Sequence, residues 1–149
     1  MNSVGFSIGV NEIQAVCLTG TIAAPVFKAR KRVEHPVALR FEEISSWAEV
    51  QIPLILDELQ ADKVAIKLDR TPESQKEICR VHYCGAIICL ICQRRNVPLA
   101  IINTPLQRKP FGLGRTDDIR GHIDMLVGEH PPHWNLHAQD AAIVAALNL

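Results

Sequence analysis

His137 and Asp140 stand three residues apart at the start of an apolar stretch that runs to Leu147. Ile143 and Val144 follow Asp140 at i+3 and i+4, so the spacing predicts a helix in which this carboxylate shares the buried face. A buried carboxylate is costly unless it is paired with a cation, hydrogen-bonded or bound to a metal ion. Asp140 is therefore a candidate catalytic or metal-binding residue, with His137 as its neighbour. The simpler interpretation is an acid placed near a helix start, where the helix dipole favours it.

Composition predicts one globular domain spanning residues 1–149, with 48% hydrophobic residues. Lysine plus arginine equals aspartate plus glutamate at 16 each, so no overall positive field points to nucleic acid. Two local basic regions could contact a nucleic-acid backbone or could simply be solvated surface. Their members are Lys28, Arg30, Lys31 and Arg32 in the first region, and Arg108, Lys109 and Arg115 in the second.

The chain shows no signal-peptide pattern after Met1 and no apolar run near the ~18 residues of a membrane span. A cytoplasmic location is expected, where the five cysteines would stay reduced. Cys89 and Cys92 form a C-x-x-C pattern, but isoleucine and leucine surround them. This context favours small core residues over a zinc or redox site.

Alternating and continuous apolar patterns predict five strands. They are expected at residues 3–10, 12–19, 21–35, 63–69 and 97–103. The first two should form a hairpin, and Pro25 favours an edge position for the third. The last two are apolar enough to be buried in a parallel arrangement.

Four helices complete the predicted order. The capping-box pattern Ser46–Glu49 opens the first, and Pro53 should kink or split it. A second helix should begin at Thr71-Pro72 and run to about residue 96, with an apolar stripe that includes Ile78. The remaining two carry Ile119, Ile123 and Leu126 on one side, and the stretch after Asn135, which could cap the last helix. Three strands followed by alternating helices and strands indicate one α/β domain with a mixed sheet.

This order is that of the ribonuclease H-like fold, and the chain resembles the RuvC-type Holliday-junction resolvases along nearly its whole length. Residues 4–9 resemble the family's G-I-D-P-G strand, and 64–67 resemble its V-A-I-E strand. A helix with a small-residue centre corresponds to 80–86, and the G-x-G-R-A-D-K loop to 112–118. The closing helix, H-x-x-D or D-x-x-D followed by A-L-A-x-A, corresponds to 137–146. The resemblance implies three antiparallel strands followed by alternating helices and parallel strands.

The resemblance also implies chemistry that this sequence lacks in part. Such nucleases gather three or four carboxylates around two divalent cations, Mg²⁺ or Mn²⁺, which activate water and stabilise the leaving oxygen. Here Ser7 stands at the first-strand acid and Lys67 at the second. Only His137 and Asp140 match the family pattern on the last helix.

Several arrangements remain open from the sequence. By strand alternation Asp69 is expected on the same sheet face as Lys67, where it could supply a displaced carboxylate and metal ligand together with Asp140. Asp69 could instead pair with Lys67 or Arg70, or cap the following turn. A Lys67–Asp140 pair could replace the metal cluster, or Lys67 could contact a phosphate. Glu12, which starts the second strand, should not reach the first acid's position.

Three functions follow. The first is a RuvC-like protein that binds branched or duplex DNA and has lost, or strongly reduced, nuclease activity. The second is an active metal-dependent endonuclease with a rearranged site of Asp69, His137 and Asp140. The third is a non-catalytic protein-interaction module, which the neutral net charge favours. A homodimer is expected for either DNA-directed function, because a four-way junction has two-fold symmetry.

Overall fold

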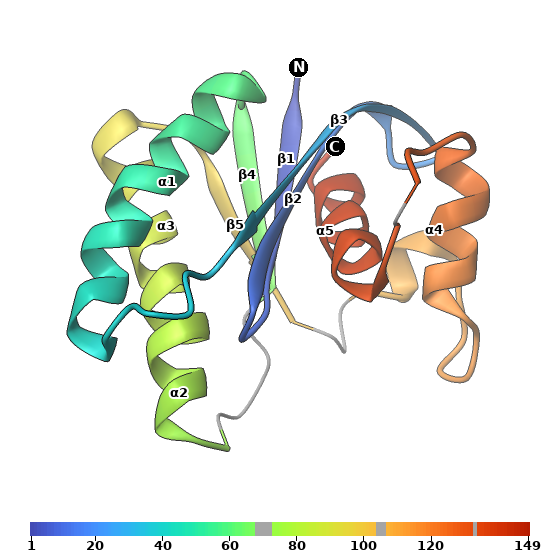
Figure 1. Ribbon diagram of the computed structural model, residues 1–149. Coiled ribbons are helices and arrows are strands. Elements are labelled where there is room, and N and C mark those ends of the chain that lie inside the picture. Colours follow the sequence, from blue (N-terminus) through green and yellow to red (C-terminus); the bar gives the residue numbers. More distant parts are fainter. Residues whose placement is uncertain (68–72, 104–106, 133) are drawn as a thin grey trace.

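The computed structural model describes residues 1–67, 73–103, 107–132 and 134–149. Its strands form one mixed sheet in the order β3-β2-β1-β4-β5 (Figure 1). The strands are β1 (Ser3–Ile8), β2 (Glu12–Thr21), β3 (Ala24–Glu34), β4 (Lys63–Lys67) and β5 (Leu99–Ile102). The β1–β2 and β2–β3 pairs are antiparallel, whereas β4 runs parallel to both β1 and β5.

Helices cover both faces of this sheet, with α1 and α3 on one side and α4 and α5 on the other (Figure 1). The α-helices are α1 (Ile44–Glu58), α2 (Gln75–Glu77), α3 (Cys84–Arg95), α4 (Ile119–Val127) and α5 (Leu136–Leu147). Short turns of other helix types are η1 (Phe41–Glu43), the π-helical η2 (Ile78–Tyr83) and η4 (Lys109–Phe111). None of the helices described is long and apolar enough to cross a membrane.

Each face of the sheet has its own apolar core. The larger core joins the sheet to α1, η2 and α3 and includes Phe6, Ile52 and Ile88, which are fully buried. The smaller core joins β2 to α4 and α5 and includes Leu18 and Ile123. Because each face of the sheet packs against its own layer of helices, we expect the sheet to be rigid, as in other three-layer α/β domains.

Helix α5 lies unusually close to β1, at Gly5. A Cβ atom on Gly5 would stand 2.0 Å from the Ala141 carbonyl oxygen and 2.6 Å from the Ala145 nitrogen. The Ser3 hydroxyl donates a hydrogen bond of 2.8 Å to the Ala145 carbonyl. A strand glycine facing helix alanines thus lets two backbones touch, and this contact fixes where α5 sits on the sheet.

The strand predictions are mostly confirmed. The first hairpin forms, and β3 occupies the edge position that Pro25 predicted. The expectation of a buried strand at 97–103 is wrong, because β5 is the opposite edge and Ile101 is 55% exposed. The strand predicted at 63–69 is described only to Lys67, and the rest of that prediction lies outside the described residues.

The helix predictions fail mainly at helix starts. Helix α1 begins before Ser46, after a turn in which the Glu43 carboxylate accepts a hydrogen bond from the Arg40 N–H, and it runs through Pro53 without splitting. The predicted start at Thr71-Pro72 lies outside the described residues, and Ser74 caps α2. Ile78 is 40% exposed because it opens a π-helical turn, which breaks the 3.6-residue spacing on which the stripe was based.

Replacing Gly5 with alanine should destabilise the protein by about 2 kcal/mol or more, because the added methyl group must displace the backbone of α5. The free energy of unfolding in urea measures this loss. Gly114→Ala is the control, since a Cβ there first meets the movable Asp117 carboxylate at 3.3 Å. Equal stability of the two variants would contradict the close packing of α5 on β1.

Candidate functional site

The candidate site lies where β1 and β4 end and α5 begins. Asn135 caps α5, as predicted, by accepting a hydrogen bond of 3.0 Å from the Ala138 N–H. The cap places His137 and Asp140 in the first turns of a helix that is apolar on nearly every side. Both side chains consequently face the carboxyl ends of the strands next to α5.

The Asp140 carboxylate forms ion pairs with two cationic side chains. The Lys67 ammonium donates to its Oδ2 atom at 3.3 Å. The Arg120 guanidinium makes a two-pronged contact, with Nε donating to Oδ1 at 3.1 Å and Nη2 to Oδ2 at 3.2 Å. The Asp140 side chain is 13% exposed, so the carboxylate is largely shielded from water, whereas Arg120 remains partly exposed. The sheet, α4 and α5 thus each contribute one charged group.

The Lys67–Asp140 contact is one of the arrangements that the sequence left open. Arg120 was not predicted as a site residue. It follows the Asp118 cap of α4, and nothing in its spacing reveals that α4 places it beside the start of α5. Two cations against one carboxylate leave this cluster with a formal charge of +1.

His137 contacts β1 instead of Asp140. Its Nδ1 atom lies 3.2 Å from the Ser7 hydroxyl, which is almost fully buried. A Cβ atom on Gly9 would stand 2.8 Å from Nε2 of His137, so the imidazole packs directly on the Gly9 backbone. Ser7 and His137 therefore form a hydrogen-bonded pair beside the charged cluster.

Glu12 is the other shielded carboxylate at this end of the sheet, and its partners are already in place. It accepts hydrogen bonds from Asn135 at 2.8 Å and Gln14 at 3.0 Å, and it pairs with Arg32. Burial raises the pKa of this carboxyl, but the hydrogen bonds from Gln14, Arg32 and Asn135 outweigh burial and lower the pKa to about 2. Glu12 acts as an anchor that ties β2 and β3 to the cap of α5.

The described donors do not fit a two-metal centre. Magnesium prefers several anionic oxygen ligands, whereas this site offers one carboxylate that two cations already neutralise, a serine hydroxyl and an imidazole. Among the described residues, no group of three histidine, cysteine or acidic side chains is placed to hold a metal ion. Asp69, the predicted additional ligand, lies outside the described residues.

The first basic region does not form a single patch. Successive side chains of β3 point to opposite faces, so Lys31 reaches Glu58 of α1 at 2.6 Å while Arg32 pairs with Glu12 and Glu34. Lys28 is exposed, and Arg30 is partly buried. Lys31 and Arg32, two of the four cations in this region, are therefore matched by nearby acids.

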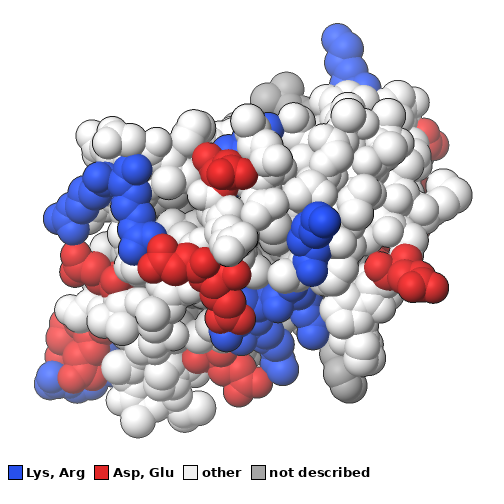
Figure 2. Space-filling view, turned by 90° about the horizontal axis from the view of Figure 1, so that it is seen from above, with Lys and Arg blue, Asp and Glu red and all other residues white. Residues whose placement is uncertain are grey.

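The second basic region is more accessible. Lys109 and Arg115 are exposed on the loop before α4, and Arg108 donates from Nε to the Asp117 carbonyl at 3.3 Å. Figure 2 views the molecule from the end where β1 starts, and there basic and acidic side chains are interspersed over a mostly uncharged surface. The end of the molecule where β1 starts therefore shows no continuous basic patch.

The cysteines pack as core residues, as predicted. Burial raises the pKa of the Cys84 thiol to about 12 and that of Cys92 to about 11. Both thiols are therefore protonated and unreactive near neutral pH.

Comparison with solved structures identifies the fold. RuvC of Thermus thermophilus bound to a Holliday junction substrate superposes with a TM-score of 0.78 at 14% identity, covering 98% of this chain and 90% of that chain. The yeast mitochondrial Holliday junction resolvase gives 0.70 at 8% identity, covering 96% and 75%. The fowlpox virus resolvase bound to Holliday junction DNA gives 0.56 at 13% identity, covering 100% and 93%.

The sequence itself matches no protein-family model and no curated protein. The structural likeness nevertheless runs through almost the whole chain. The mixed five-stranded sheet and its helices have the ribonuclease H-like fold of RuvC, which confirms the fold predicted from the sequence.

Protonation of Glu12 should destabilise the protein in acid. A folded-state pKa of about 2 against an ordinary 4.5 contributes stability that is complete above pH 4.5 and is lost as the pH falls toward 2. The loss is on the order of 3 kcal/mol. Urea unfolding at pH 7, 5, 4 and 3 should show a smaller acid loss for Glu12→Gln than for the wild type.

Two controls make this assignment specific. The exposed Glu42→Gln variant should follow the wild-type pH profile. The pKa of His35 is lowered to about 4 by burial and by the nearby Arg80, so His35 causes a separate loss of stability as the pH falls from about 6.5 to about 4. A Glu12→Gln profile parallel to the wild type below pH 4.5 would show that the Glu12 network does not stabilise the fold.

Proposed function

We propose that this protein binds DNA, branched or duplex, through the RuvC-like fold and has lost, or strongly reduced, nuclease activity. The observation that carries this proposal is the pairing of Asp140 with both Lys67 and Arg120. The solved structures of similar fold include two resolvases in complex with Holliday junctions, which supports DNA as the ligand class.

The charge at the site argues for phosphate binding over metal-assisted hydrolysis. By the family pattern, Ser7 and Lys67 occupy positions of metal-binding acids, so the site has a cation where a nuclease gathers anions. The cluster of Lys67, Arg120 and Asp140 keeps a net positive charge, and the Arg120 side chain is 39% exposed. A backbone phosphate could therefore be attracted to the place where a metal-bound phosphate sits in a nuclease.

Binding of this kind depends on contacts with the DNA phosphate backbone more than on contacts with the bases. Contacts from Lys67, Arg120 and the exposed Lys109 and Arg115 would release counterions, so affinity should fall steeply with salt and vary little with sequence. A homodimer, which a two-fold symmetric junction would favour, belongs to this proposal.

The direct test measures binding and cleavage of a labelled four-way junction and a matched duplex, in magnesium, in manganese and in EDTA. The protein should bind both DNAs without cutting them, and EDTA should not weaken binding. Lys67→Gln should weaken binding roughly threefold to tenfold by removing a phosphate contact. Asp140→Asn should bind as tightly as the wild type or more tightly, because it removes the only negative charge of the cluster.

Lys63→Gln is the matched control, since Lys63 lies at the opposite end of β4 and donates to the Leu149 carbonyl. It should bind DNA like the wild type. Metal-dependent cleavage that Asp140→Asn abolishes would refute the proposal and favour a rearranged nuclease. Absence of binding to either DNA would point instead to a protein-interaction module.

A further inference from the structure

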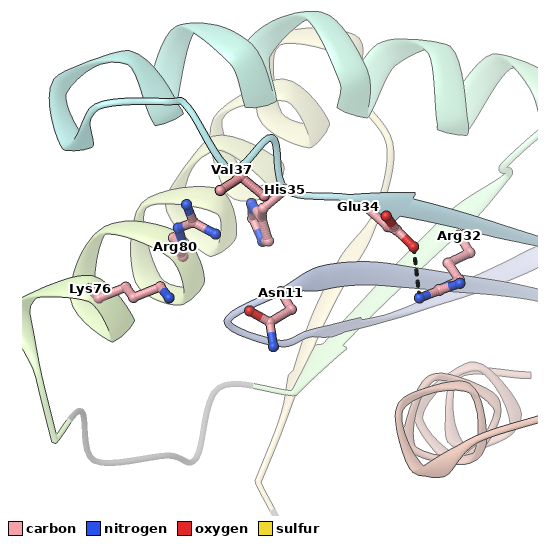
Figure 3. A pocket seen from close by; sticks show the side chains of 7 residues that line it. All are labelled: Asn11, Arg32, Glu34, His35, Val37, Lys76 and Arg80. Carbon is pink, nitrogen blue, oxygen red and sulfur yellow. Dashed lines mark ion pairs between the residues drawn. The ribbon is translucent and has the colours of Figure 1, made fainter.

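A second cationic site lies beside the turn between β1 and β2. It is a cavity of about 360 Å³, a size at which proteins enclose small ligands (Figure 3). Its walls come from that turn, the end of β3 and the start of the helical segment after Ser74. The lining residues are Asn11, Arg32, Glu34, His35, Val37, Lys76 and Arg80.

The charges in this cavity do not balance. Arg32 is matched by Glu34 at 2.9 Å and by Glu12 behind it. Neither Lys76 nor Arg80 pairs with an acid among the described residues, and Figure 3 shows both reaching from one helical segment toward the turn of Asn11 and the end of β3. As far as the described residues show, the cavity therefore contains two cations, Lys76 and Arg80, without an acidic partner.

Arg80 is the buried element of this site. It is only 7% exposed, and its Nη1 and Nη2 atoms donate to the Val10 carbonyl at 3.3 Å and the Pro36 carbonyl at 3.4 Å. Its buried Nε–H has no hydrogen-bond partner among the described residues. Carbonyl contacts orient a guanidinium without neutralising it, so its positive charge can still attract an anion.

His35 and Asn11 shape the site without adding charge. His35 is buried, holds the Gly9 carbonyl at 3.1 Å through Nε2 and packs on Trp47. Its lowered pKa keeps the ring neutral near pH 7, which leaves Arg80 and Lys76 as the charged donors. Asn11 adds an amide that can donate to an oxyanion.

We propose that this cavity holds a phosphate group of a bound nucleic-acid strand, with Arg80 and Lys76 as its ligands. The inference rests on the proposed DNA-binding function and adds to it a second, separate phosphate contact. Hydrogen bonds connect the two sites, because Arg32 on the cavity wall pairs with Glu12, and Glu12 accepts from the Asn135 cap of α5. A strand crossing this end of the sheet would then be gripped at both sites.

The test uses Lys76, because it is an exposed cation whose loss should not disturb folding, whereas the buried Arg80 donates to two backbone carbonyls. Lys76→Gln should weaken binding of a four-way junction roughly threefold to tenfold and lower the slope of log affinity against log salt by about one. Lys76→Arg should restore both values. Arg94→Gln, which changes an exposed arginine at the end of α3, should leave them unchanged.

A second measurement uses inorganic phosphate as the probe. In NMR titrations of the wild type, the Nε–H resonance of Arg80 should shift saturably with phosphate, and the shift should be weaker in Lys76→Gln. DNA binding that is unaffected by Lys76→Gln would overturn the inference while leaving the proposed function intact. If the protein binds no DNA, the proposed function fails, and a saturable phosphate shift would still support phosphate recognition by the cavity. The absence of both the phosphate-dependent shift and the effect of Lys76→Gln on DNA binding would overturn the inference.

Discussion

The contact between α5 and β1 at Gly5 determines which side chains come together at the candidate site, where β1 and β4 end and α5 begins. Since a helix backbone touches a strand backbone there, α5 has almost no freedom to slide or rotate on the sheet. The first turns of α5 are thereby fixed beside the ends of β1 and β4. Because the backbone contact fixes the position of α5, His137 lies against Ser7 and Asp140 lies against Lys67.

Electrostatics then decides which chemistry the position supports. A carboxylate that is 13% exposed must be compensated, and a cluster of acids could achieve this only by binding cations from solution. In this chain Lys67 and Arg120 provide the compensation. The same fold can therefore keep a buried carboxylate at the start of α5 that side chains of the protein itself neutralise.

The sequence predicts the order of the elements and the sheet well, because these depend on apolar patterns and on a single punctuating residue such as Pro25. It predicts helix starts less well. Ser46 fits a capping box but lies inside α1, because the chain already turns helically at η1 and a local pattern cannot register that. The exposure of Ile101 also escaped prediction, since an edge strand and a central strand of four apolar residues look alike in sequence.

The candidate site was predictable only in part for a related reason. Its members on β1 and β4, Ser7 and Lys67, were indicated by the family resemblance, and Asp140 on α5 by the spacing of the last helix. Arg120 and Arg80 do not, because each reaches its site through tertiary packing of a helix whose neighbours the sequence does not specify. Arg120 donates to a carboxylate and Arg80 to backbone carbonyls, at partly buried and buried positions respectively. From composition alone, both would be taken for ordinary surface charges.

Neutralisation of Asp140 by Lys67 and Arg120, instead of by a metal ion, can be tested with a crystal of the protein soaked in manganese chloride. We expect the two ion pairs to remain intact and the anomalous difference map to show no peak within coordination distance of Asp140. A manganese peak on the Asp140 carboxylate, with Lys67 displaced, would show that a metal ion neutralises this group.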